Sequence, residues 1–303
     1  MSRIIDGVEH FDRNDFSLMA GCQSPVAVNH VRDQQTLGAA HYHDFYELAT
    51  VLDGSGRYEY QGVVYDLNPG DTFIIQPGTR HHYLEQRKLS LMNFIWYPEE
   101  LPVSPETLNQ IPGYREFFDL EPQSRSIFRF EYHLVLMPEQ TATMQLFYRR
   151  IENELKERAN GYFLTSGLIF TELLITVSRF YNDSKKHFDK NGNDLQKIGE
   201  VLAFIDANYM HRISRSNAAK IYGSSETTFS RSFKRIMTES FFDYLLNLRL
   251  RHAREMLRQS DASISRIAQE CGFCDSNYLC YRFRMKFGIP PHQYRISGQK
   301  NDF

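Results

Sequence analysis

Residues 264–295 read ISRIAQECGFCDSNYLCYRFRMKFGIPPHQYR, and their spacing decides the class of the C-terminal half. Apolar residues recur at helical spacing on both sides of a turn at 271–273. Asp275 or Ser276 offers a side chain that caps the second helix. Two short helices joined by a tight, glycine-containing turn have the layout of a helix-turn-helix unit.

The same layout occurs a second time, at an offset of 50 residues, because FSRSFK at 229–234 aligns with LCYRFR at 279–284. A turn at 222–224 precedes the first of these segments. Between the two units, apolar residues at helical spacing predict one long connecting helix. They are Phe242, Leu245, Leu246, Leu250, Ala253 and Leu257. One helix-turn-helix match is weak because any helical hairpin has similar periods, but two in register are a strong signal.

The second helix of each unit has one apolar face and one polar face. The apolar positions point inward, so hydroxyl, amide and cationic side chains remain on the open face. Such groups pair with base edges and phosphates in a major groove. The predicted DNA-contacting residues are Thr227, Ser230, Arg231 and Lys234 in the first unit, and Ser276, Asn277, Cys280, Tyr281, Arg282 and Arg284 in the second.

The charge distribution agrees with this prediction, although the net charge is only −2. Residues 209–303 carry 16 Lys and Arg against 8 Asp and Glu, whereas the remaining 208 residues carry 19 against 29. A chance gradient is the alternative explanation. The asymmetry favours a polyanion partner for the C-terminal part alone.

The composition bounds the class of protein. With 303 residues, 42% hydrophobic and 24% charged, the chain is globular and long enough for two domains. It has no run of about 18 apolar residues and no secretory signal, so no membrane partner is expected. Four cysteines do not make a disulfide framework, which favours the cytoplasm. Cys271 and Cys274 have the spacing of half a zinc site, but no second pair follows, so we predict ordinary thiols.

From His41 to Trp96 the pattern is that of short strands separated by turns, which predicts an antiparallel barrel or sandwich. The strand-like runs are FYELATVL, RYEY, VVYDL, TFIIQ and LMNFIWY, with turn signals at 53–56, 61–62, 68–71 and 77–80. Residues 97–137 contain several prolines and predict an irregular stretch with a short helix around 114–118.

After Pro138, apolar residues recur at helical spacing and predict a helical hairpin over 138–181. Its apolar stripes need a partner, either the barrel or a second copy of the chain. The expected organisation is α+β, with an effector-binding barrel at 1–137, a dimerisation hairpin at 138–181, a polar linker at 182–194 and an all-α domain at 195–303 that carries both helix-turn-helix units.

Residues 264–295 resemble the signature of the AraC/XylS family of bacterial transcription regulators. The N-terminal half resembles the cupin-type sensor domain of many members, through H41-Y-H43-D-F-Y-E47 and G70-D-T-F-I-I-Q-P-G78-T-R-H81. Among these members, the chain is most similar to regulators of L-rhamnose operons. The resemblance implies a sequence-specific activator, not an enzyme, that binds promoter DNA as a homodimer, contacts RNA polymerase and responds to a small polar effector such as a sugar.

The resemblance also draws attention to His41, His43, Glu47 and His81. The first three share one face of an uninterrupted strand, and His81 comes from a later turn. Three alternatives remain open: an effector pocket in which Trp96 stacks on the ligand, a divalent-metal site, or structural histidines. We favour the effector pocket, with no metal and no cofactor. A cupin metalloenzyme fused to a DNA-binding module, or an effector-independent regulator, is the alternative function.

Overall fold

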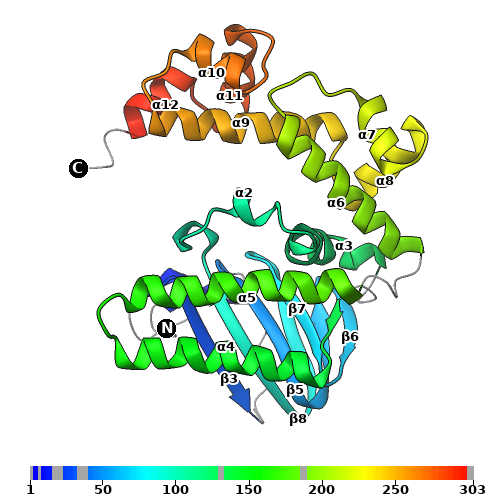
Figure 1. Cartoon of the computed structure of the whole chain (residues 1–303), viewed down its shortest axis with the longest axis vertical. Helices are drawn as coiled ribbons and strands as arrows, with labels where there is room; N and C mark the ends of the chain where they lie inside the picture. The colour runs from blue at the N-terminus through cyan, green and yellow to red at the C-terminus, as the bar shows by residue number, and fades with distance from the viewer. Residues whose placement is uncertain are drawn as a thin grey trace. The chain divides into compact units, whose positions relative to one another are not determined.

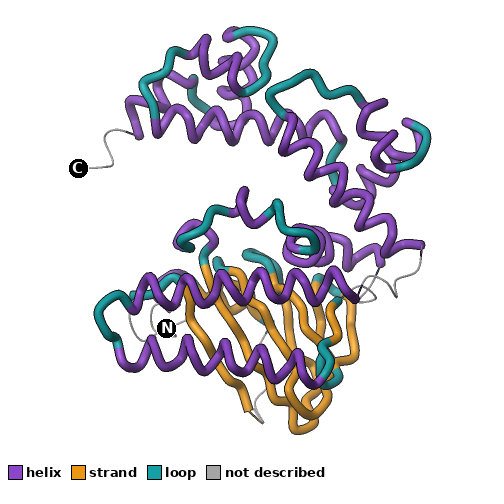
Figure 2. Tube along the Cα trace, viewed as in Figure 1, coloured by secondary structure: helices purple, strands orange, loops and turns teal. Residues whose placement is uncertain are grey.

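The computed structural model describes residues 3–5, 8–15, 23–32, 40–128, 133–184 and 190–298 (Figure 1). The chain divides into two compact units, Met1–Leu195 and Gln196–Phe303. The described part of the first unit combines a β-sheet with helices, whereas that of the second is helical (Figure 2).

The described strands of the first unit form one sheet. They are β1 (Arg3–Ile5), β2 (Val8–Phe11), β3 (Val26–Arg32), β4 (His41–His43), β5 (Tyr46–Tyr60), β6 (Val63–Leu67), β7 (Asp71–Ile75), β8 (His81–Trp96) and β9 (Leu134–Val135). The pairings are antiparallel except for β2 with β4, which is parallel. The order β1-β2-β4-β8-β5-β7-β9 does not return to its start, so the described strands make an open sheet and not a closed barrel.

The paired strands β5 and β8 are far longer than the sequence predicted. We expected a turn at 53–56, but β5 runs through this segment with register shifts beside Asp53 and Ser55. Gly54 has a φ of 77°, and a Cβ there would lie 2.2 Å from the carbonyl oxygen of Lys88 on β8. Only glycine fits so close to the neighbouring backbone. The expected turn is therefore a bulge at which the strand bends.

One face of the sheet is covered by α4 (Pro138–Glu157) and α5 (Tyr162–Ser184), which lie side by side across it (Figure 1). Phe170 of α5 packs with Phe94 and Trp96 of β8 in one buried cluster. The apolar stripe of the hairpin is therefore buried on the sheet. By length and mean hydropathy α5 is apolar enough to cross a membrane, but half of its most apolar window is buried in this core.

The other face has its own core, which includes Ala49, Val51, Tyr58, Tyr60, Phe73, Ile75 and Leu91. The segment expected to be irregular contributes η1 (Pro98–Glu100), α2 (Pro105–Leu108), η2 (Glu116–Leu120) and α3 (Glu121–Phe128). Helix therefore continues well past the predicted 114–118. Pro122 lies where the π-helical turn η2 passes into α3, so the hydrogen-bond pattern of the helix changes at the proline.

The helices of the second unit are α6 (Lys190–Asn208), α7 (Arg215–Tyr222), α8 (Glu226–Met237), α9 (Phe241–Gln259), α10 (Ile264–Glu270), α11 (Ser276–Phe287) and α12 (Pro291–Gly298). Helix α5 ends at Ser184 and α6 begins at Lys190, both within the predicted linker, whose residues 185–189 lie outside the described part. Helices α7–α8 and α10–α11 form the two predicted helix-turn-helix units.

Helix α9 supports both units through different residues. Phe241 and Tyr244, near its start, contact Phe233 of α8. Leu250, Ala253 and Leu257, nearer its end, belong to a separate cluster with Leu279 and Phe283 of α11. The two helix-turn-helix units are thus held on one helix by two cores.

Candidate functional site

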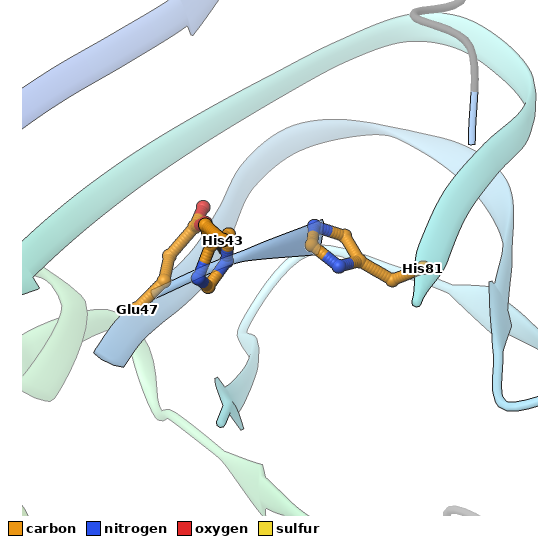
Figure 3. A group of neighbouring side chains, drawn as sticks. All are labelled: His43, Glu47 and His81. Atoms are coloured by element: carbon orange, nitrogen blue, oxygen red, sulfur yellow. Dashed lines mark ion pairs between the residues drawn. The ribbon is translucent and has the colours of Figure 1, made fainter. Parts of the chain in front are cut away.

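A buried polar cluster lies where β4, β5 and β8 come together. His43 ends β4, Glu47 follows the start of β5 and His81 begins β8, and their side chains converge (Figure 3). Their exposed fractions are 1%, 8% and 1%. One nitrogen or oxygen of each side chain lies within 4.8 Å of the others. His43 Nε2 is 3.2 Å from Glu47 Oε2.

Backbone carbonyl groups hold both imidazole rings. His43 Nδ1 lies 2.7 Å from the carbonyl oxygen of Phe45, and His81 Nδ1 lies 2.9 Å from that of Thr79. Because a carbonyl oxygen only accepts, Nδ1–H of each ring is the donor. Burial lowers the pKa of His81 well below its usual value, and His41 and His43 nearby lower it further, so this imidazole is neutral at pH 7.

His41 belongs to the same neighbourhood, but Trp96 does not. The rings of His41 and His81 have centroids 4.2 Å apart. Glu47 pairs across the sheet with Ile95, so the next residue, Trp96, points to the opposite face. Its indole packs against Phe170 at a centroid distance of 5.0 Å, beneath the helical hairpin. The predicted stacking of Trp96 on an effector beside these histidines therefore does not fit this geometry.

Tyr58, Tyr83 and Asn93 are polar residues that the sequence reading missed. Tyr58 pairs across the sheet with Tyr83, and its ring centroid lies 6.1 Å from that of His81. Burial raises the pKa of both tyrosines well above the usual value, and the Glu47 carboxylate raises both further. Strand alternation carries the signal that would have found Tyr83, because it lies two residues after His81 on the same strand face.

Several polar atoms of this cluster are buried without a hydrogen-bond partner among the described residues. They are His43 Nε2, the hydroxyls of Tyr58 and Tyr83, and Asn93 Oδ1. Each such atom costs free energy unless something else satisfies it, on the order of 1–3 kcal/mol. Their gathering on one face is typical of a site that takes a polar ligand or a cation.

The second candidate site is the open face of α8 and α11. The structure exposes Thr227, Arg231, Lys234, Asn277, Tyr281 and Arg284, and half-buries Ser230, Ser276, Cys280 and Arg282. The hydroxyl of Ser230 is buried, so it does not reach a base from this conformation. The guanidinium of Arg282 lies 6.0 Å from the Tyr278 ring.

Side-chain caps fix where these two helices begin. The hydroxyl of Ser225 accepts from the Thr228 backbone N–H, and the carboxylate of Asp275 accepts from that of Tyr278 at 2.7 Å. The predicted cap at Asp275 is thus confirmed. Because the cap fixes the first residue of each helix, it also fixes the direction of the open face relative to the turn before it.

The cysteines show no sign of a metal site within the described residues. Cys271 is buried beside Met256, and burial raises the pKa of its thiol to about 11. Cys274 is exposed and Cys280 is half-buried. Cys271 and Cys274 therefore remain predicted ordinary thiols.

Comparison with known proteins gives a matching picture for both units. The family described as "AraC-like ligand binding domain" matches residues 25–124, and "Helix-turn-helix domain" matches residues 218–297. The chain is 25% identical over 273 residues to the HTH-type transcriptional activator RhaR of Mannheimia succiniciproducens, covering 90% of this chain and 92% of that one. It is 28% identical to RhaS of Escherichia coli O139:H28, covering 84% of this chain and 86% of that one.

A solved structure of an AraC-type DNA-binding regulator from Chromobacterium violaceum is 30% identical over 34% of this chain and 91% of that one, with a TM-score of 0.32. A ligand-binding domain joined to two helix-turn-helix units defines a DNA-binding transcription regulator. The chain belongs to the AraC family of these regulators.

Proposed function

We propose that this regulator is a transcription activator that binds promoter DNA and responds to a small polar effector, a sugar such as L-rhamnose. The buried cluster of partnerless polar atoms in the ligand-binding domain carries the proposal, because hydroxyl groups of a sugar satisfy such atoms. The relatives named above are activators, which supports the sign of regulation. We propose no enzymatic activity for the chain, and a location in the cytoplasm.

A thermal-shift screen of sugars tests this function. A ligand that binds only the folded state raises the melting temperature in proportion to the logarithm of its concentration. We expect one sugar or related polyol to raise the melting temperature of the full chain and to change its affinity for promoter DNA. A screen in which no small metabolite does so contradicts the effector role and favours an effector-independent regulator.

His41, His43, Glu47 and His81 form the proposed effector site, together with Tyr58 and Tyr83. Trp96 is left out because its side chain lies on the opposite face of the sheet.

We expect Tyr83→Phe to weaken effector binding without destabilising the effector-free protein. Its hydroxyl has no partner among the described residues, so its removal costs no internal hydrogen bond. A bond to the effector is lost, worth about 0.5–1.5 kcal/mol. The effector concentration for half-maximal response rises up to about tenfold. Calorimetric titration and melting curves measure the two effects.

Tyr148→Phe is the matched control, because Tyr148 is a half-buried tyrosine on α4, against the other face of the sheet. It leaves the effector response unchanged. If Tyr83→Phe lowers the melting temperature of the effector-free protein while its response stays normal, the hydroxyl is structural and not part of the site.

The DNA-binding role distinguishes Arg231 from Lys234 on the open face of α8. Arg231, nearer the helix start, forks onto a guanine, so Arg231→Ala costs about 1–3 kcal/mol and relaxes the preference at one base pair. Lys234 contacts phosphate, so Lys234→Ala weakens binding to all sequences alike and lowers the salt slope by about one. If Arg231→Ala loses equal affinity for cognate and random DNA, Arg231 does not recognise a base.

The outer surface of the helical hairpin supports a homodimer. Leu146, Phe163, Leu164 and Leu168 are exposed large apolar side chains on α4 and α5, although the inner stripe is buried on the sheet. Leu164 and Leu168 are one helical turn apart and share a face. A second copy covers such a surface at little cost. The molar mass of the purified chain tests this pairing.

We also propose that the DNA-bound dimer contacts RNA polymerase, because this is how an activator of transcription acts.

A further inference from the structure

We propose that His43, Glu47 and His81 bind one divalent transition-metal ion, and that the polar effector completes the coordination of this ion. The metal site depends only on the three side chains. The part played by the effector rests on the function proposed above.

The first argument is the convergence of ligand atoms. One atom from each of the three side chains lies within 4.8 Å of the others, and all three side chains are buried (Figure 3). Two ligands at about 2.1 Å from a tetrahedral ion stand about 3.4 Å apart. His43 Nε2 and Glu47 Oε2 are already 3.2 Å apart. The remaining atom must move closer for all three to bind one ion.

The second argument is the orientation of the two imidazoles. Each ring gives its Nδ1–H to a backbone carbonyl, of Phe45 for His43 and of Thr79 for His81. This leaves Nε2 of each ring directed away from its own backbone. Histidines that bind metals are held in the same manner, with the second nitrogen donating to a carbonyl or carboxylate. Two segments far apart in the sequence provide this support independently.

The third argument is that a buried imidazole nitrogen faces a buried carboxylate without a hydrogen bond between them. His43 Nε2 lies near Glu47 but makes no hydrogen bond to it, or to any other described residue. A buried carboxylate needs a compensating positive charge close to it. A divalent cation provides that charge and satisfies both acceptors at once.

The ligand set indicates the class of ion. Two imidazoles and one carboxylate, without a thiolate, suit Fe, Mn, Co, Ni or Zn and not Cu(I). Three protein ligands leave open positions on the ion. The partnerless hydroxyls of Tyr58 and Tyr83 lie beside the cluster, so an oxygen-rich ligand bound to the ion also receives their hydrogen bonds.

Metal titration of the full chain tests the site. The protein is stripped with a chelator, dialysed, and titrated with Co²⁺ and with Zn²⁺. We expect one ion per chain by elemental analysis, a raised melting temperature, and visible absorbance from protein-bound Co²⁺. If neither ion binds saturably and the Co²⁺ spectrum remains that of the hydrated ion, the proposal is wrong.

Variants locate the ion. Glu47→Gln keeps the size of the side chain, and both it and His43→Gln weaken Co²⁺ binding at least about 100-fold, since outer-shell changes alone cost 10–100-fold. His82→Gln is the matched control: His82 adjoins His81 but points to the other side of β8, so binding stays normal. If His82→Gln loses the ion and Glu47→Gln keeps it, the ion is bound elsewhere. The wild-type Co²⁺ spectrum remains informative if a variant fails to fold.

A sugar screen with and without chelator separates this inference from the proposed function. A sugar that raises the melting temperature of the metal-loaded chain alone supports both. A sugar that acts equally on the metal-free chain supports the effector pocket and overturns the inference that the effector completes the coordination of the ion. One bound ion without any small-molecule response supports the metal site and removes the effector role.

Discussion

Arg125→Met is expected to lower the free energy of unfolding of the first unit by about 3–5 kcal/mol, because it leaves a carboxylate buried without its cation. Arg125 is 0% exposed and its partner Glu121 is 1% exposed. The pair is bidentate within α3, with N–O distances of 2.8 and 2.6 Å. The guanidinium also lies 4.8 Å from the centre of the Tyr60 ring. Burial lowers the pKa of Arg125, but the Glu121 carboxylate more than offsets this and raises it.

The measurement uses the single tryptophan of the chain. Trp96 lies in the first unit, so its fluorescence during denaturation follows that unit alone. The double variant Glu121→Leu with Arg125→Met recovers most of the loss, because exchange of both charges for apolar side chains is often neutral. Arg150, which forms an exposed ion pair with Glu172, gives the control Arg150→Met, with a loss below about 1 kcal/mol. If Arg125→Met lowers the free energy of unfolding as little as Arg150→Met does, the Arg125–Glu121 pair does not hold α3 in place.

Phe233→Ala is expected to destabilise the second unit by a similar amount, about 3–5 kcal/mol, and to abolish DNA binding at growth temperature. Phe233 is fully buried at the inner side of α8, in contact with Phe229, Phe241 and Tyr244. Its loss leaves a cavity between α8 and α9, so the open face of α8 loses its support. Circular dichroism and fluorescence anisotropy with labelled promoter DNA measure the two effects.

Phe242 provides the comparison, because it is the neighbour of Phe241 on α9 but is 54% exposed. Phe242→Ala costs little stability. Because the two units have separate cores, the unfolding transition of the first unit, followed by Trp96 fluorescence, is expected to be the same in Phe233→Ala as in the wild type. If the fluorescence transition shifts as well, the two units do not unfold independently.

The helical half of the fold was predictable because its signals are local. Apolar residues at helical spacing, a turn at 222–224 or 271–273 and a capping Asp275 all lie within a few residues of one another in the sequence. They specified both helix-turn-helix units without knowledge of tertiary contacts.

The sheet was less predictable because its pairings are not local. The bulge at Gly54 depends on close approach to Lys88, and the face that Trp96 occupies depends on register with β5. Tyr83 lies two residues after His81 on the same strand face, so strand alternation could have predicted it from the sequence. The buried charge pair of α3 could not be predicted, because nothing near Arg125 in the sequence indicates that this helix is buried against the sheet.

Helix α9 separates the support of α8 and α11, the two helices that we propose read DNA, and this has an evolutionary consequence. Substitutions on the open face of α8 do not repack α11, because each helix has its own core on a different part of α9. One half of the recognised DNA sequence can therefore change by mutation while the other half keeps the regulator at its promoter. New operators can then arise through functional intermediates, one half at a time.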